Sequence, residues 1–299
     1  MTVSVVIATY RRLFELERAL VSLTAQTYKD FEVVLVDDNA DAVWNAKVKN
    51  IVEKYNDIIN ILYIVNTSNQ GSAKTRNIGI ECSNGEYITF LDDDDEYLPG
   101  KIENQLNDLI AKKADYSITD LDLYNENGKL LNKRTRHYIK QYDAESLFRY
   151  HLLYHMTGTD TLMFKKSYLL AIGCFSLIDS GDEFYLMCKA IQGGGMLAYY
   201  RGCDVMAYVH KQDGLSSGKN RIKGENALFE YKRTMYKNMD FYTRQNISMR
   251  HYAVLAYTYL KMQKYGRCFL NGMHSFLCAP TGCIRLIREY RYESSDNQS

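Results

Sequence analysis

The sequence predicts an α/β fold with a mainly parallel sheet, followed by a helical C-terminal extension. Apolar runs rich in β-branched residues alternate with segments that read as helices, which is the pattern of βαβ units. Two of the apolar runs end in clusters of aspartate. The charge is unevenly distributed, because residues 211–299 carry 15 Lys and Arg against 7 Asp and Glu, a net +8 in a chain of net +1.

The first 121 residues show the alternation most clearly. Residues 3–8 form a short apolar run that is typical of a buried strand. Residues 11–26 follow, with Leu16, Leu20 and Leu23 at helical spacing. Further strands are expected at 31–36, 61–65, 86–91 and 116–121, and further helices at 42–55, 71–81 and 102–112.

Regularity falls after Asp122, where residues 125–128 read Asn-Glu-Asn-Gly and predict a hairpin turn. Beyond Gly224 the pattern is helical almost to the end. We therefore expect an α/β domain at 1–218 and a basic helical region at 219–299. Later strands are expected at 161–164, 196–200 and 205–210, and later helices at 166–172, 182–191, 252–262 and 269–276.

Composition limits the classes of protein. The chain is 46% hydrophobic, which is enough for a large core. Its seven cysteines are odd in number and include no CxxC pair, which argues against a disulfide framework or a zinc site and favours a reducing cytoplasm. The N-terminus leads directly into a strand and no apolar run reaches about 18 residues, so neither a signal peptide nor a transmembrane helix is expected.

The four consecutive aspartates at 92–95 are the strongest chemical signal. Adjacent acids repel one another, whereas Mg²⁺ or Mn²⁺ bound to a polyphosphate prefers oxygen ligands. The alternative is a solvated acidic turn before a helix. Asp37 and Asp38 end another strand, and parallel strands place their carboxyl ends at one edge of the sheet. Both clusters and the loop 9–12 then form a crevice suited to a nucleoside diphosphate.

The loop after the first strand excludes other nucleotide-binding folds. It reads Ala-Thr-Tyr-Arg-Arg at residues 8–12 and contains neither G-x-G-x-x-G nor a P-loop. An NAD-dependent dehydrogenase is therefore disfavoured, and phosphate must be held by metal and basic side chains. No nucleic-acid partner is expected.

Several motifs together resemble family 2 glycosyltransferases of the GT-A fold. They occur in the family's order and spacing over about the first 100 residues, and a weaker match continues to about 218. The motifs are VVIATY at 5–10, SLTAQTY at 22–28, FEVVLVDD at 31–38, NQGSAKTRN at 69–77 and GEYITFLDDDD at 85–95.

The resemblance implies an inverting transfer of a sugar from a nucleoside diphosphate sugar, with residues 1–100 as the nucleotide-binding half and 101–218 as the acceptor-side half. A UDP-sugar is the expected donor, and Mn²⁺ or Mg²⁺ the cofactor. Asp94 is the first choice of metal ligand, with Asp92 toward ribose and metal and His210 closing over the diphosphate. Asp38 matches the base-binding acid. The other nucleotide-binding residues implied are Thr9, Tyr10, Arg12, Lys74, Arg76 and Asp93. For Arg76, a residue that fixes the third helix to the sheet is an equal alternative.

An inverting transfer also needs a general base. The family's Glu-Asp pair is inverted here, as Asp182-Glu183. Alignment of the following Phe-Tyr-Leu places Glu183 at the base position, with Asp182 as second choice. Without the resemblance, both would be acids at a helix start stabilised by the macrodipole. The inversion also leaves open a non-catalytic protein that binds nucleotide sugars or glycans.

The expected acceptor is a saccharide, either free or on a lipid carrier, in the synthesis of a surface glycan. The basic helical region predicts peripheral attachment to the inner face of the membrane, because amphipathic helices with cationic faces bind anionic lipids. A dimerisation or packing module with a solvated basic face is an equal alternative, so a homodimer is also open.

Overall fold

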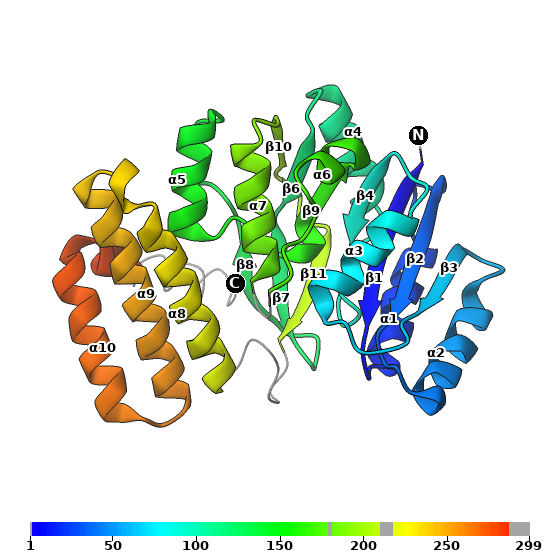
Figure 1. Ribbon diagram of the computed structural model, residues 1–299, viewed down its shortest axis with the longest axis horizontal. Coiled ribbons are helices and arrows are strands. Elements are labelled where there is room, and N and C mark those ends of the chain that lie inside the picture. Colours follow the sequence, from blue (N-terminus) through cyan, green and yellow to red (C-terminus); the bar gives the residue numbers. More distant parts are fainter. Residues whose placement is uncertain (1, 179–180, 210–217, 287–299) are drawn as a thin grey trace. The chain divides into compact units, whose positions relative to one another are not determined.

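The structure is a computed structural model that describes residues 2–178, 181–209 and 218–286 (Figure 1). It divides into two compact units, Met1–Leu147 with Met156–Tyr208, and Phe148–His155 with Val209–Ser299. The expected domains 1–218 and 219–299 stay a prediction, because compactness alone does not show that either part folds independently.

Seven strands form the larger sheet of the first unit: β1 (Val3–Thr9), β2 (Phe31–Asp37), β3 (Asn60–Val65), β4 (Tyr87–Phe90), β6 (Tyr116–Thr119), β9 (Leu162–Lys165) and β10 (Leu197–Tyr200). Their spatial order is β10-β6-β9-β4-β1-β2-β3. Only β9 runs antiparallel to its neighbours, β4 and β6. The mainly parallel mixed sheet predicted from the sequence is confirmed.

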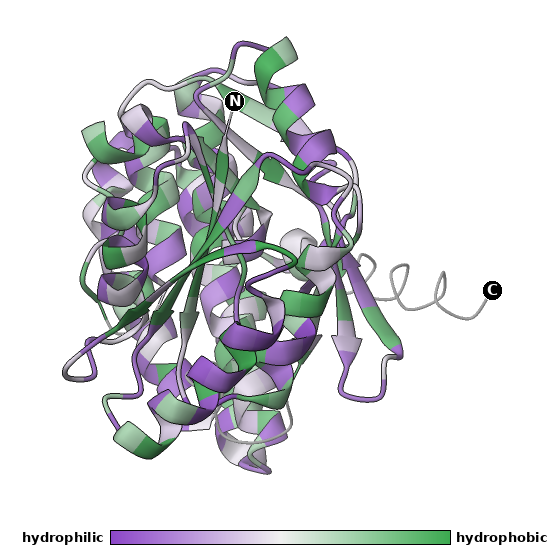
Figure 2. Cartoon of the chain, turned by 90° about the vertical axis from the view of Figure 1, so that its right-hand side faces the viewer, coloured by the Kyte–Doolittle hydropathy of each residue, from purple (hydrophilic) through white to green (hydrophobic). Residues whose placement is uncertain are grey.

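Helices cover both faces of this sheet, which is why its central strands are apolar throughout. On one face, core residues of β1 and β2 form one hydrophobic cluster with α1 (Phe14–Thr24), α2 (Ala42–Tyr55) and α4 (Lys101–Ala111). On the other face lies α3 (Ser72–Cys82), which approaches β1 closely. A Cβ atom on its Gly79 would lie 2.5 Å from Val6 Cγ1, so only glycine allows this approach. Figure 2 shows the resulting concentration of apolar residues along the strands.

A smaller sheet has the order β5-β11-β7-β8, formed by β5 (Glu96–Tyr97), β11 (Val205–Val209), β7 (Leu121–Asn125) and β8 (Leu130–Arg134). The predicted turn at 125–128 joins β7 to β8. Asn125 Oδ1 accepts hydrogen bonds from the backbone N–H groups of Asn127 at 3.0 Å and Lys129 at 2.9 Å, and Gly128 has a φ of 73°. The hairpin prediction is confirmed.

The remaining helices of the first unit are short. They are η1 (Thr159–Thr161), α6 (Lys166–Ala171) and α7 (Asp182–Gln192), while α5 (Ala144–Tyr154) begins in the first unit and ends in the second. Neither α5 nor β5 was predicted, since β5 has two residues and shows no periodicity. The first helix begins at Phe14 and not at Arg11, because Arg11 has a φ of 52°, outside the helical region.

The second unit contains α8 (Gly218–Thr234), η2 (Tyr236–Asn238), α9 (Phe241–Lys261) and α10 (Tyr265–Cys278). Within the unit, α9 packs against both α8 and α10 (Figure 1). Asp240 caps α9 by accepting a hydrogen bond from the N–H of Thr243 at 2.9 Å. Among the described residues, no helix combines the length and the apolar composition needed to cross a membrane.

Candidate functional site

Four loops meet at one edge of the larger sheet. The loops after β1, β2 and β4 arrive there because parallel strands end at the same edge. The segment before β9 joins them, because β9 is antiparallel and therefore begins where its neighbours end. The polar side chains of this edge come from segments more than 140 residues apart, between Thr9 and Asp160.

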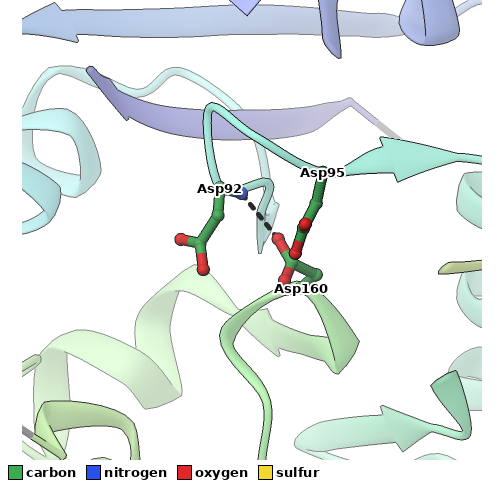
Figure 3. Close-up of side chains that lie close together, drawn as sticks. All are labelled: Asp92, Asp95 and Asp160. Carbon is green, nitrogen blue, oxygen red and sulfur yellow. Dashed lines mark hydrogen bonds between the residues drawn. The ribbon is translucent and has the colours of Figure 1, made fainter. Parts of the chain in front are cut away.

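Three carboxylates converge at this edge (Figure 3). Asp92 and Asp95 lie on the loop after β4 and Asp160 lies in η1, and their nearest oxygens are all within 4.8 Å of one another. Asp160 Oδ1 accepts a hydrogen bond from the backbone N–H of Asp92 at 2.5 Å, which fixes η1 to the loop. Asp95 and Asp160 are buried.

The electrostatics of this cluster are unfavourable without a cation. Burial raises the pKa of Asp95, and the negative charge of Asp160 raises it further. Burial also raises the pKa of Asp160, with the charge of Asp92 as the next cause. Carboxylate oxygens are the ligands that Mg²⁺ and Mn²⁺ prefer, so the three groups fit such an ion. From the sequence, residues 157–160 resemble the acceptor-side segment of the family, and Asp160 was not predicted among the metal ligands; its signal is an acid just before strand β9.

The other two aspartates of the run interact with the loop after β1. Asp93 is buried and accepts hydrogen bonds from Thr9 Oγ1 at 2.8 Å, Tyr10 N at 3.2 Å and Arg12 Nη1 at 2.6 Å. Burial raises the pKa of Asp93 to about 6, although the charge of Arg12 opposes the shift. The Arg12 guanidinium also pairs with Asp94 at 3.0 Å. Thus Asp92 and Asp95 belong to the carboxylate cluster, whereas Asp93 and Asp94 pair with Arg12.

Asp94 therefore faces a cation of the protein itself, and is not among the three clustered carboxylates. Its role as a metal ligand stays a prediction. The other predicted metal ligand, His210, lies outside the described residues.

Asp38, the predicted base-binding acid, organises the loop before α3. Its carboxylate accepts hydrogen bonds from Asn66 Nδ2 at 2.8 Å and from the backbone N–H groups of Gln70 at 2.8 Å and Gly71 at 2.9 Å. A carboxylate has about four acceptor positions, so about one remains for a ligand. Tyr10 is exposed beside this edge, and Lys74 is exposed on α3.

Arg76 links two acidic groups of the site. Its Nη2 lies 2.6 Å from Asp92 Oδ1, and its Nη1 lies 2.8 Å from Asp182 Oδ2. The guanidinium is largely buried, and its planar shape allows both contacts at once. It therefore joins the loop after β4 to the first residue of α7.

Asp182 and Glu183 begin α7 after Gly181, whose φ of 76° is left-handed and suits glycine. Asp182 is buried against Arg76, while Glu183 is partly exposed. Burial raises the pKa of Glu183, and the neighbouring charge of Asp182 raises it further. The two acids thus differ in environment, because Asp182 is buried in an ion pair and Glu183 is partly exposed.

Lys101, in the first turn of α4, is fully buried, and no role was predicted for it from the sequence. Lys101 Nζ donates hydrogen bonds to Thr89 Oγ1 at 2.5 Å and Tyr97 Oη at 2.8 Å. The Tyr97 hydroxyl contacts the carbonyl oxygen of Asp160 at 3.3 Å. Burial lowers the pKa of Lys101 to about 7, although the charge of Asp160 opposes the shift.

The sequence matches the family model described as glycosyl transferase family 2 over residues 4–170. The curated GalNAc(5)-diNAcBac-PP-undecaprenol beta-1,3-glucosyltransferase of Campylobacter jejuni is 38% identical over 100 residues, which is 33% of this chain and 31% of the relative. The matched stretch covers less than two thirds of the length of the curated relatives.

Solved structures share the fold. S. aureus TarS 1–349 in complex with UDP-GlcNAc has a TM-score of 0.59 and 15% identity, and the match covers 91% of each chain. Mannosyltransferase PcManGT from Pyrobaculum calidifontis, in complex with GDP-Man and Mn²⁺, has a TM-score of 0.63 and 16% identity, with 99% of this chain and 84% of that chain covered. The expected GT-A type fold with added C-terminal helices is confirmed.

Proposed function

Because this chain belongs to glycosyl transferase family 2, we propose that it transfers a sugar from a nucleoside diphosphate sugar to a saccharide hydroxyl, with inversion at the anomeric carbon. The proposal rests mainly on one observation: two acidic centres, the carboxylate cluster and the Asp182-Glu183 pair, are linked at one edge of the sheet. Arg76 connects Asp92 of the carboxylate cluster to Asp182, next to Glu183. One centre suits a metal diphosphate, and the other suits proton removal.

The donor side is formed by the loops after β1, β2 and β4. Asp38 has about one acceptor position left for an N–H of the base. Its backbone N–H donates to the carbonyl oxygen of Thr9 at 2.9 Å, and the next residue, Tyr10, offers an exposed ring. Asp92, Asp95 and Asp160 would hold Mn²⁺ or Mg²⁺, and Asp94 is the ligand that the family resemblance implies. When bound, the ion neutralises charge on the diphosphate leaving group.

Glu183 is the proposed general base. It would accept the proton of the acceptor hydroxyl while that oxygen forms a bond to the anomeric carbon. The bond from this carbon to the diphosphate oxygen breaks, and the nucleoside diphosphate leaves with the electron pair. Asp182 is held by Arg76, which favours Glu183 for this role. A raised pKa also suits a base that works near neutral pH.

The proposed acceptor is a saccharide on a lipid diphosphate carrier. The name of the Campylobacter jejuni relative describes a glucosyltransferase acting on such a molecule, which supports the same acceptor class here. A UDP-hexose or UDP-N-acetylhexosamine is the proposed donor, as in the TarS complex with UDP-GlcNAc. The cytoplasmic location expected from the sequence stays a prediction.

Calorimetric titration with UDP-, dTDP- and GDP-sugars, with and without Mn²⁺, tests the proposal. We expect one donor class to bind in a metal-dependent way, and Asp92→Asn to abolish that dependence. Hydrolysis of the same donor would then be measured for wild type and Glu183→Gln. A folded protein that binds no donor would overturn the proposal, and donor binding with no hydrolysis above the protein-free rate in either protein would favour the non-catalytic alternative.

A further inference from the structure

Helix α10 carries a continuous apolar stripe that is open to solvent. The six side chains of the stripe are 47% to 70% exposed: Tyr265, Phe269, Leu270, Met273, Phe276 and Leu277. At 100° per residue they fall within an arc of about 140° around the helix. Single exposed apolar residues are normal on a protein surface, whereas a contiguous stripe marks an interaction site.

The stripe points away from the helix that α10 packs on. Ser275 is buried, and its Oγ donates a hydrogen bond to the carbonyl oxygen of Met249 in α9 at 2.9 Å. The centre of the stripe lies about 150° around the helix from Ser275, by the same helical geometry. An amphipathic helix normally turns its apolar face to its neighbour. Here α10 meets α9 through a small hydroxyl and exposes its large apolar side chains.

On α9, near the turn between the two helices, Tyr257 and Leu260 are also 41% and 49% exposed. Three cations lie at or beside this turn in the sequence, Lys261, Lys264 and Arg267, and Lys261 Nζ lies 4.9 Å from the centre of the Tyr257 ring. No Asp or Glu occurs anywhere from Phe241 to Leu286, a stretch with six Lys and Arg. The hairpin therefore combines an exposed apolar stripe with basic side chains and no acidic ones.

We propose that the α9–α10 hairpin docks on the surface of a bilayer that contains anionic phospholipids. The apolar stripe would enter the boundary between head groups and acyl chains, while the lysines and the arginine contact the phosphates. A second copy of the chain is the less favoured occupant, because a symmetric contact would bring two acid-free cationic surfaces together. The proposal does not depend on the transferase reaction.

The test is co-sedimentation of the full-length protein with vesicles of phosphatidylcholine, with and without phosphatidylglycerol. We expect the protein to bind the anionic vesicles at least about tenfold more tightly than the neutral ones. The double variant Phe269→Ser with Leu277→Ser should weaken anionic binding by at least about tenfold. The matched control is Val21→Ser with Ile58→Ser, which removes two exposed apolar side chains of the first unit and should bind like wild type.

Two further measurements separate lipid docking from misfolding and from dimerisation. Circular dichroism and thermal unfolding check that both double variants fold, which is expected because all four positions are exposed. Lys264→Gln with Arg267→Gln should weaken binding to anionic vesicles and leave binding to neutral vesicles unchanged. Absence of vesicle binding by wild type, or equal loss in the control variant, would overturn the proposal. So would a dimer in analytical ultracentrifugation that the Phe269 and Leu277 substitutions dissociate, since the stripe would then be a subunit interface.

Discussion

Arg76 Nη1 lies 2.8 Å from Asp182 Oδ2, and this ion pair joins the two acidic centres of the site. The other terminal nitrogen of the guanidinium, Nη2, lies 2.6 Å from Asp92 Oδ1. Asp92 stands in the carboxylate cluster, and Asp182 precedes the proposed base. A rotation of α7 would therefore strain the contact of Arg76 with Asp92. We infer that Arg76 fixes the distance between the bound nucleotide sugar and the proposed base Glu183.

Substitution of Arg76 by Lys should lower kcat by roughly 100-fold with a smaller change in KM, because an ammonium keeps the charge but cannot make both contacts. Steady-state kinetics with the donor found by titration would measure this. Glu81→Gln, at an exposed position of the same helix with no assigned role, is the comparison for an effect on the helix alone. A rate within twofold of wild type for Arg76→Lys would contradict the bridging role.

Asp160→Asn should weaken Mn²⁺ binding in the presence of UDP by at least about tenfold, because it removes one of three clustered oxygen ligands. The same substitution should raise the thermal unfolding temperature in EDTA. The reason is that burial and like charges raise the pKa values of Asp95 and Asp160, so the charged cluster destabilises the metal-free fold. Asp94→Asn, which loses its contact with Arg12, should not raise that temperature. The reverse pattern would assign the metal to Asp94.

Glu183→Gln should abolish most turnover while donor binding stays within about threefold of wild type, because the amide cannot accept the acceptor proton. The wild-type kcat/KM should rise as pH increases through the raised pKa of Glu183, since only the deprotonated carboxylate is a base. Glu183→Asp should retain some activity and a rising profile. A flat profile from mildly acidic to alkaline pH would remove Glu183 from the role of base.

Lys101→Met should change how stability depends on pH. Burial lowers the pKa of Lys101 from 10.5 to about 7, so between these values the unfolded chain binds a proton that the folded chain does not. Stability must then rise with pH in this window, by up to about 1.4 kcal/mol per pH unit. Lys101→Met should lose this slope.

Urea unfolding from about pH 7.5 to 9.5 measures the slope in both proteins. Trp44 is the single tryptophan of the chain and lies in α2, so its fluorescence reports the first unit. Equal slopes for wild type and Lys101→Met would show that Lys101 stays protonated in the fold.

Most of the parallel sheet was predictable, because its strands are buried on both faces and read as continuous apolar runs between helical segments. The apolar run of β1 and the leucine spacing of α1 show this directly, and the aspartates at the ends of β2 and β4 had to meet at one edge. Prediction was weaker where local pattern carries little information. Two-residue β5 has no period, and α5 lies between irregular segments.

The composition of the site could be predicted only in part. Asp160 reaches the edge because β9 is antiparallel, and strand direction is set by tertiary packing. The division of the four aspartates depends on Arg12 from another loop, and the burial of Lys101 depends on Thr89 and Tyr97. These are long-range contacts that a run of neighbouring residues does not encode.

The most direct test of the account is the position of Mn²⁺ in crystals grown with UDP, located by anomalous scattering. We expect one peak among the carboxylates of Asp92, Asp95 and Asp160, with the UDP diphosphate beside it. A peak on Asp94 without Asp95 and Asp160, or UDP bound at this edge with no metal, would contradict it.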